Sequence, residues 1–105
     1  MSLLSARDRR KETRYEVELD GSVEYEGAWY DVTVSDLSAS GALIMVEGRF
    51  TRGAILALHI QELGTFEAEI AHAGSGFCGL QFVNPAAHRD QLTDWLRRMF
   101  GNSLR

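Results

Sequence analysis

Residues 15–26 read YEVELDGSVEYE, and this stretch alternates apolar and polar residues along most of its length. Successive side chains of a β-strand point to opposite faces, so the alternation places the apolar residues on one face and the carboxylates on the other. One apolar face and one polar face are typical of a half-buried antiparallel strand. The sequence therefore predicts a strand over residues 15–26, and Gly21 predicts a bulge or a bend inside it.

Further runs of strand-like residues follow, separated by turn residues at hairpin spacing. They cover residues 29–35, 42–46, 54–60, 66–73 and 77–83. Six short antiparallel strands favour a small closed barrel, because closure leaves no unpaired strand edge. We therefore predict a mainly β fold built on a six-stranded antiparallel β-barrel.

The C-terminal part of the chain changes to helical periodicity. Asn84 and Pro85 suit the cap and the first turn of a C-terminal α-helix over about residues 86–100. An apolar stripe at helical spacing runs along this segment: Leu92, Trp95, Leu96, Met99 and Phe100. We expect the helix to cover one mouth or flank of the barrel, with Arg97 and Arg98 complementing its dipole.

The bulk composition restricts the class of protein. The 105 residues suit a single domain with one core, and a net charge of −4 argues against a broad nucleic-acid-binding surface. No apolar run approaches the roughly 20 residues that span a bilayer, and the first residues lack the pattern of a secretory signal. Cys78 has no partner for an internal disulfide, and the three histidines have no zinc-like spacing with it. We therefore expect a cytoplasmic protein without a metal site or a cofactor.

The charge is distributed unevenly. Residues 7–14 hold five basic and two acidic side chains, a local balance of +3, so the rest of the chain carries −7. A basic segment on an acidic body can concentrate one compact anion, and the alternative is a solvated basic tail without a ligand. We predict a flexible N-terminal arm over residues 1–8, followed by a single domain over residues 9–105.

The first candidate motif is the Arg-x-x-x-Arg of Arg10 and Arg14, with Arg9 directly before it. A guanidinium pairs in a bidentate way with O6 and N7 of guanine, and it also stacks on purine faces and pairs with phosphates. Arg10 and Arg14 are four residues apart, so they lie on one side of either a helical or an extended segment. The three arginines are therefore candidates for binding a flat, guanine-containing anion.

The second candidate motif is Asp-x-Ser-x-x-Gly, formed by Asp36, Ser38 and Gly41. We place residues 36–41 in a polar turn between the second and third strands, because Asp and Ser bond nearby backbone groups in such turns. Asp36 would accept hydrogen bonds from guanine N–H groups, and Ser38 would donate to a phosphate or a base. Gly41 would let the backbone come close or adopt a positive φ angle.

The order of these features resembles the PilZ domain, the bacterial receptor module for cyclic di-GMP. Arginines directly precede an alternating strand, the Asp motif follows a second strand, and a six-stranded β pattern with a terminal helix completes the likeness. It covers about residues 9–100, and residues 79–83, GLQFV, look like the penultimate glycine-containing strand of the family. The resemblance implies a split β-barrel that binds a nucleotide second messenger.

The resemblance also implies roles for the two motifs. Arg10 and Arg14 match the paired arginines that hold guanine bases and phosphates, and Asp36, Ser38 and Gly41 match the second motif. An arginine at the position of Arg9 favours a stacked pair of cyclic di-GMP molecules over a single one. All these residues are present in this sequence.

The resulting hypothesis is a cyclic di-GMP receptor that is not an enzyme. Its ligand would bridge the arm and the barrel, order the arm and alter the surface offered to an unknown protein partner, with effects on motility or biofilm formation. One alternative is a PilZ-fold adaptor with weak or no nucleotide binding. Another is a β-barrel that binds single-stranded nucleic acid through the basic arm, Trp29 and Tyr30.

Overall fold

The computed structural model describes residues 13–100, which form six strands followed by two helical segments. The strands are β1 (Tyr15–Tyr25), β2 (Ala28–Leu37), β3 (Gly41–Met45), β4 (Ile55–Ile60), β5 (Gly64–Gly74) and β6 (Phe77–Phe82). A 3₁₀ turn, η1 (Pro85–Ala87), leads into the helix α2 (Arg89–Phe100). The predicted arm over residues 1–8, together with Arg9 and Arg10, lies outside the described residues.

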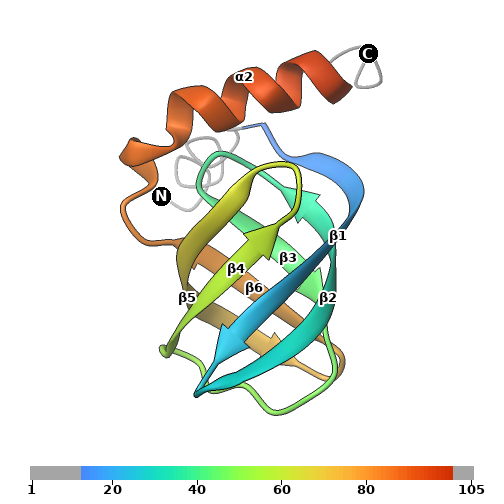
Figure 1. Cartoon of the computed structure of the whole chain (residues 1–105), viewed down its shortest axis with the longest axis vertical. Coiled ribbons are helices and arrows are strands. Elements are labelled where there is room, and N and C mark those ends of the chain that lie inside the picture. The colour runs from blue at the N-terminus through green and yellow to red at the C-terminus, as the bar shows by residue number, and fades with distance from the viewer. Residues whose placement is uncertain (1–12, 101–105) are drawn as a thin grey trace, which may run out of the picture.

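The six strands close into an antiparallel barrel in the order β1-β2-β3-β6-β5-β4. The barrel closes where β1 pairs with β4 over residues 21–24 and 57–60. Figure 1 shows α2 lying across one open end of this barrel, close to the start of β1. The predicted six-stranded barrel with a C-terminal helix is therefore confirmed.

The alternation in β1 produces the expected inward face, but the irregularity is not at Gly21. The register between β1 and β2 shifts between Glu16 and Leu19, which is where the strand bulges. A side chain at Gly21 would place its Cβ 2.7 Å from the carbonyl oxygen of His59 on β4. Gly21 is therefore required for the close approach of two strands where the barrel closes.

The barrel interior is filled by side chains from every strand and from the helix. The residues with almost no solvent exposure are Val23, Val34, Leu37, Ile44, Leu58, Ile60, Ala68, Ile70, Cys78, Leu92 and Leu96. Leu92 and Leu96 extend the same core, which shows that α2 closes one end of the barrel. Burial of this apolar set is the main force that holds the helix on the strands.

The strand β2 is longer than predicted, and this moves part of the second motif. Asp36 and Leu37 belong to β2, so the connection to β3 is shorter than the predicted turn over residues 36–41. Asp36 pairs with Glu16 on β1 and with Leu43 on β3, and Leu37 is buried in the core. These pairings with neighbouring strands outweigh the local turn preference of the residues.

The helix begins later than predicted. Asn84 adopts a left-handed conformation with φ 58° and caps the 3₁₀ turn without a side-chain hydrogen bond. The α-helix starts at Arg89. The carbonyl oxygen of the preceding residue, His88, accepts a backbone hydrogen bond of 2.9 Å from the N–H of Leu92. Pro85 therefore begins a 3₁₀ turn, because its fixed φ angle suits either kind of first turn.

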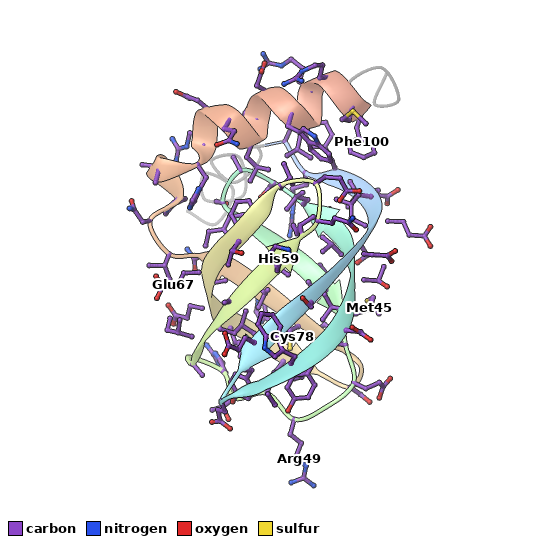
Figure 2. The ribbon with its side chains drawn as sticks, in the orientation of Figure 1. Met45, Arg49, His59, Glu67, Cys78 and Phe100 are labelled. Atoms are coloured by element: carbon purple, nitrogen blue, oxygen red, sulfur yellow. The ribbon has the colours of Figure 1, made fainter. Side chains whose placement is uncertain are left out.

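An aromatic cluster joins the end of α2 to the start of β1. The ring of Phe100 lies 6.4 Å from that of Tyr15 and 5.8 Å from that of Trp95. Figure 2 shows Phe100 at this end of the molecule and Arg49 at the opposite end of the barrel. Within residues 13–100, no helix has the length and apolar character needed to cross a lipid bilayer.

Candidate ligand-binding groove

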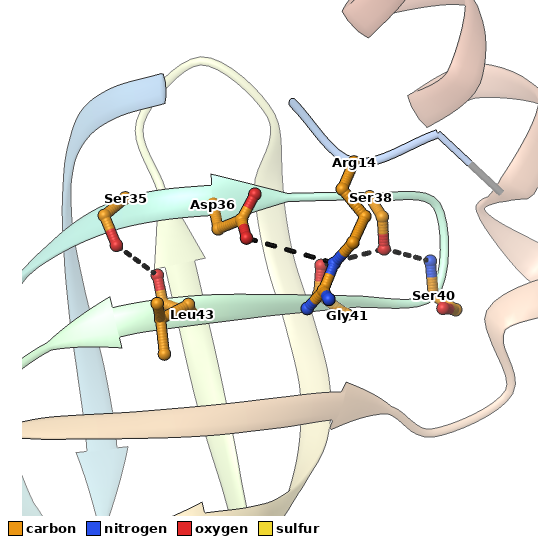
Figure 3. A network of polar contacts seen from close by, with 7 residues as sticks. All are labelled: Arg14, Ser35, Asp36, Ser38, Ser40, Gly41 and Leu43. Carbon is orange, nitrogen blue, oxygen red and sulfur yellow. Dashed lines mark hydrogen bonds and ion pairs between the residues drawn. The ribbon is translucent and has the colours of Figure 1, made fainter. Parts of the chain in front are cut away.

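The connection between β2 and β3 is fixed by the side chain of Ser38. Its backbone N–H donates to the carbonyl oxygen of Gly41 at 2.9 Å, and its hydroxyl lies 3.4 Å from the same oxygen. Its Oγ also accepts a hydrogen bond of 3.3 Å from the N–H of Ser40 (Figure 3). Ser38 is only 6% exposed, so most of this side chain supports the turn from inside. The second motif therefore has a structural role in addition to any contact with a ligand.

Gly41 permits a close approach between β3 and β6. A Cβ at this position would collide with the carbonyl oxygen of Leu80 on the neighbouring strand. Gly41 is not among the glycines with a positive φ angle. It therefore permits a close approach of the backbone, and the predicted alternative of a positive φ angle does not apply. On β6, a Cβ at Gly79 would lie 3.3 Å from the imidazole of His72 on β5. At both positions, atoms of a neighbouring strand lie too close for a side chain to be added freely.

Arg14 and Asp36 connect the two motifs. Arg14 Nε lies 3.9 Å from Asp36 Oδ2, and the two side chains are 72% and 26% exposed. Figure 3 shows the guanidinium of Arg14 reaching over β2 toward the β2–β3 connection. Because 72% of the Arg14 side chain is exposed, its guanidinium remains accessible to a ligand while the carboxylate lies near Nε.

A groove of about 1040 Å³ lies beside this connection, between the outer surface of the barrel and α2. It is lined by Thr13, Arg14, Tyr15, Ser38, Ala39, Ser40, Gly41, Ala42, Leu43, Ala71, His72, Phe77, Gly79, Leu80, Gln81, Arg89, Thr93, Leu96 and Arg97. The described lining contains three arginines and one histidine but no Asp or Glu. A chain with a net charge of −4 thus presents a locally basic groove, and such a groove attracts anions.

The structure brings together most of the described residues that the sequence singles out. Arg14, Ser38 and Gly41 line the groove, and Asp36 contacts Arg14 from outside the lining. The sequence reasoning missed Arg89 and gave Arg97 only a role with the helix dipole, although both line the groove. Their spacing of eight residues, with Thr93 halfway, was the available signal that they share one side of the helix.

The titratable groups of this region are few. Within residues 13–100, no three His, Cys, Asp or Glu side chains converge in a way that could hold a metal ion. Burial raises the pKa of the Cys78 thiol, which lies inside the barrel and away from the groove. His72 is the one histidine in the described lining of the groove.

The fold and the groove define a small antiparallel β-barrel domain with a basic binding surface. The sequence profile of the PilZ domain matches residues 8–98, and the chain therefore belongs to the PilZ domain family. PilZ domains are binding and adaptor domains. The identification made from the order of the motifs is thus confirmed.

Solved structures agree on the fold. The Bacillus subtilis inhibitor of motility, MotI/DgrA, is 22% identical with a TM-score of 0.74, over 92% of this chain and 54% of that chain. Escherichia coli YcgR in complex with c-di-GMP is 15% identical with a TM-score of 0.67, over 92% and 51% of the two chains. Borreliella burgdorferi PlzA in complex with c-di-GMP is 17% identical with a TM-score of 0.62, over 90% and 45%.

This chain spans about half the length of each of those three proteins. At these levels of identity the likeness is one of fold. Comparison with curated proteins gives no significant match.

Proposed function

We propose that this domain is a receptor for cyclic di-GMP and binds it in the basic groove. The observation that carries the proposal is the composition of the groove, whose described lining joins residues of both motifs and holds three arginines without a carboxylate. Cyclic di-GMP offers two phosphates and two guanine bases, which are the groups that arginines bind in a bidentate way. PlzA and YcgR have the same fold, and their solved structures contain this ligand bound to the protein.

In this proposal Arg14 and Asp36 act as a pair. Asp36 holds the Nε side of the guanidinium and so directs its terminal nitrogens toward a guanine edge or a phosphate. The carboxylate of Asp36, which is partly exposed, also accepts from guanine N–H groups. Arg9 and Arg10 contribute further guanidinium groups, and Arg9 favours a stacked pair of ligand molecules.

Ser38 and Gly41 shape the surface against which the ligand lies. Ser38 holds the β2–β3 connection through its contacts with Ser40 and Gly41, which limits the entropy lost on binding. Gly41 and Gly79 line the groove without side chains of their own, which suits contact with a flat purine ring. The ligand then bridges the arm and the barrel, orders the arm and changes the surface presented to a protein partner.

Calorimetric titration with cyclic di-GMP tests the proposal, with GTP and cyclic di-AMP as competitors of related chemistry. We expect selective, saturable binding to the wild type and a loss of at least about tenfold in affinity for Arg14→Ala, which removes one bidentate contact. Arg98→Ala is the matched control, because Arg98 is exposed, pairs with Asp94 at 3.0 Å and does not line the groove.

Thermal denaturation provides a second readout. A ligand that binds only the folded state stabilises it by about 2.7 kcal/mol when its concentration is about 100 times Kd. If cyclic di-GMP produces neither binding heat nor thermal stabilisation, the proposal is overturned and a PilZ-fold adaptor is favoured. The fitted stoichiometry distinguishes one bound molecule from a stacked pair.

A further inference from the structure

The helix α2 has a buried side and, next to it, a side that borders the groove. Leu92 and Leu96 are each 1% exposed and pack into the open end of the barrel. Arg89, Thr93 and Arg97 follow one another at intervals of four residues and line the groove. Residues four apart lie on the same side of a helix, so these three form one stripe, defined here as the groove stripe of α2.

The two arginines of the groove stripe differ from their neighbour Arg98. Arg98 forms an ion pair of 3.0 Å with Asp94 on the same helix, whereas neither Arg89 nor Arg97 pairs with a carboxylate among residues 13–100. Arg89 is also the first residue of α2, where the positive end of the helix dipole adds to its charge. Two guanidinium groups therefore border the groove from the helix outside any described ion pair, with Asp90 and Asp94 beside them on the same helix.

The groove stripe lies across the groove from the motif residues. Arg14 comes from the segment directly before β1, whereas Arg89 and Arg97 come from α2, and all three border the same cavity. Eight residues of α-helix separate Arg89 from Arg97, which corresponds to about 12 Å along the helix axis. Guanidinium groups spaced in this way can reach different phosphates of one ligand.

An aromatic contact links the two sides of the groove. Tyr15, which directly follows Arg14, packs on Phe100, and Phe100 also packs on Trp95. The start of β1 and the end of α2 therefore share one contact. A ligand that engages both Arg14 and Arg97 draws together two elements that already touch at this point.

We propose that Arg89 and Arg97 bind the phosphates of the ligand, so that α2 forms a wall of the site and its docking on the barrel is coupled to ligand binding. This inference rests on the proposed function and extends it in two respects. It assigns ligand contacts to residues outside the two motifs. It also identifies α2 as an element that responds to the ligand.

Titration of wild type, Arg89→Gln, Arg97→Gln and Arg98→Gln with cyclic di-GMP tests the assignment. We expect Arg89→Gln and Arg97→Gln each to weaken binding about tenfold, while Arg98→Gln stays within about twofold of wild type. Arg98→Gln removes the same charge from the adjacent position. Equal losses of affinity for Arg97→Gln and Arg98→Gln would therefore overturn the assignment of a direct contact between Arg97 and the ligand. Each variant is expected to keep the thermal midpoint of the wild type, because all three side chains lie on the surface.

Amide hydrogen exchange of α2 tests the coupling. Saturating cyclic di-GMP should slow amide exchange along α2 in the wild type. This protection should be lost in the double variant that carries both Arg89→Gln and Arg97→Gln. If the wild type binds and both variants bind as tightly, this inference is overturned and the proposed function stands. If the wild type does not bind cyclic di-GMP, both are overturned.

Discussion

Arg14 and Asp36 meet at 3.9 Å between Nε and Oδ2, one from the segment before β1 and the other from the end of β2. The pair joins the two sequence motifs beside the groove, and its arginine is largely exposed. Exposed ion pairs of this length contribute little to folding, because solvent screens the charges and two side chains lose freedom. In the proposed function, the pair instead positions the guanidinium for the ligand.

A double-mutant cycle of Arg14→Ala and Asp36→Ala separates these two contributions. In ligand titrations we expect the two substitutions to be clearly non-additive, with a coupling energy between about 0.5 and 3 kcal/mol, because one residue orients the other. In urea denaturation we expect each substitution to change the free energy of unfolding by less than about 1 kcal/mol. Additive losses in affinity would show that the two side chains contact the ligand independently.

Gly41→Ala and Gly79→Ala probe the surface of β3 and β6. A Cβ at Gly41 meets a backbone carbonyl that cannot move away, so we expect the free energy of unfolding to fall by about 1–3 kcal/mol. A Cβ at Gly79 meets only the exposed side chain of His72, so we expect a smaller loss of stability. Both substitutions narrow the groove and should weaken ligand binding. Equal unfolding free energies for the two variants would contradict the tight spacing between β3 and β6.

Leu92→Ala tests how firmly α2 is docked. Leu92 is almost fully buried, and truncation of such a side chain costs about 2–5 kcal/mol of unfolding free energy. Met99→Ala is the matched control on the same helix, because Met99 is exposed. This substitution should change the unfolding free energy by no more than about 0.5 kcal/mol. Denaturant titration monitored by Trp fluorescence measures both. A small effect of Leu92→Ala would mean that α2 contributes little to the core.

The strands were predictable because their signal is local. Tyr15, Val23 and Tyr25 are apolar at alternate positions, and that period is visible without knowledge of the partner strands. Asp36 was misplaced in a turn because its strand conformation depends on pairing with both β1 and β3, which lie far from it in sequence. Gly21 was read as a bulge or a bend for the same reason, since its close neighbour His59 lies on β4.

The candidate site was predictable only in part. The motifs gave Arg14, Ser38 and Gly41, which line the groove, because short motifs preserve the chemistry of a site within a few residues. Arg89 and Arg97 were not predicted as site residues, because their direction depends on how α2 is rotated on the barrel. That rotation is set by the burial of Leu92 and Leu96.

Cys78 supplies a probe of the barrel interior. Its side chain is 1% exposed, and burial raises the pKa of the thiol because the apolar surroundings disfavour the thiolate. We therefore expect a thiol reagent to modify the native protein slowly and the urea-unfolded protein rapidly. Rapid modification of the native protein would show that β6 opens readily.

The raised pKa of Cys78 also predicts a dependence of stability on pH. The folded state releases the thiol proton less readily than the unfolded state, so this contribution is fully present below the unfolded pKa of about 8.5 and is lost as the pH rises through the folded value. Cys78→Ala removes the titrating group, and its unfolding free energy should therefore fall less steeply than that of the wild type in alkaline solution. Urea denaturation of both proteins from neutral to alkaline pH measures the difference between their unfolding free energies. The contributions of the other titrating groups cancel in this difference. Parallel curves would mean that the thiolate is tolerated inside the barrel, in conflict with the burial of the side chain.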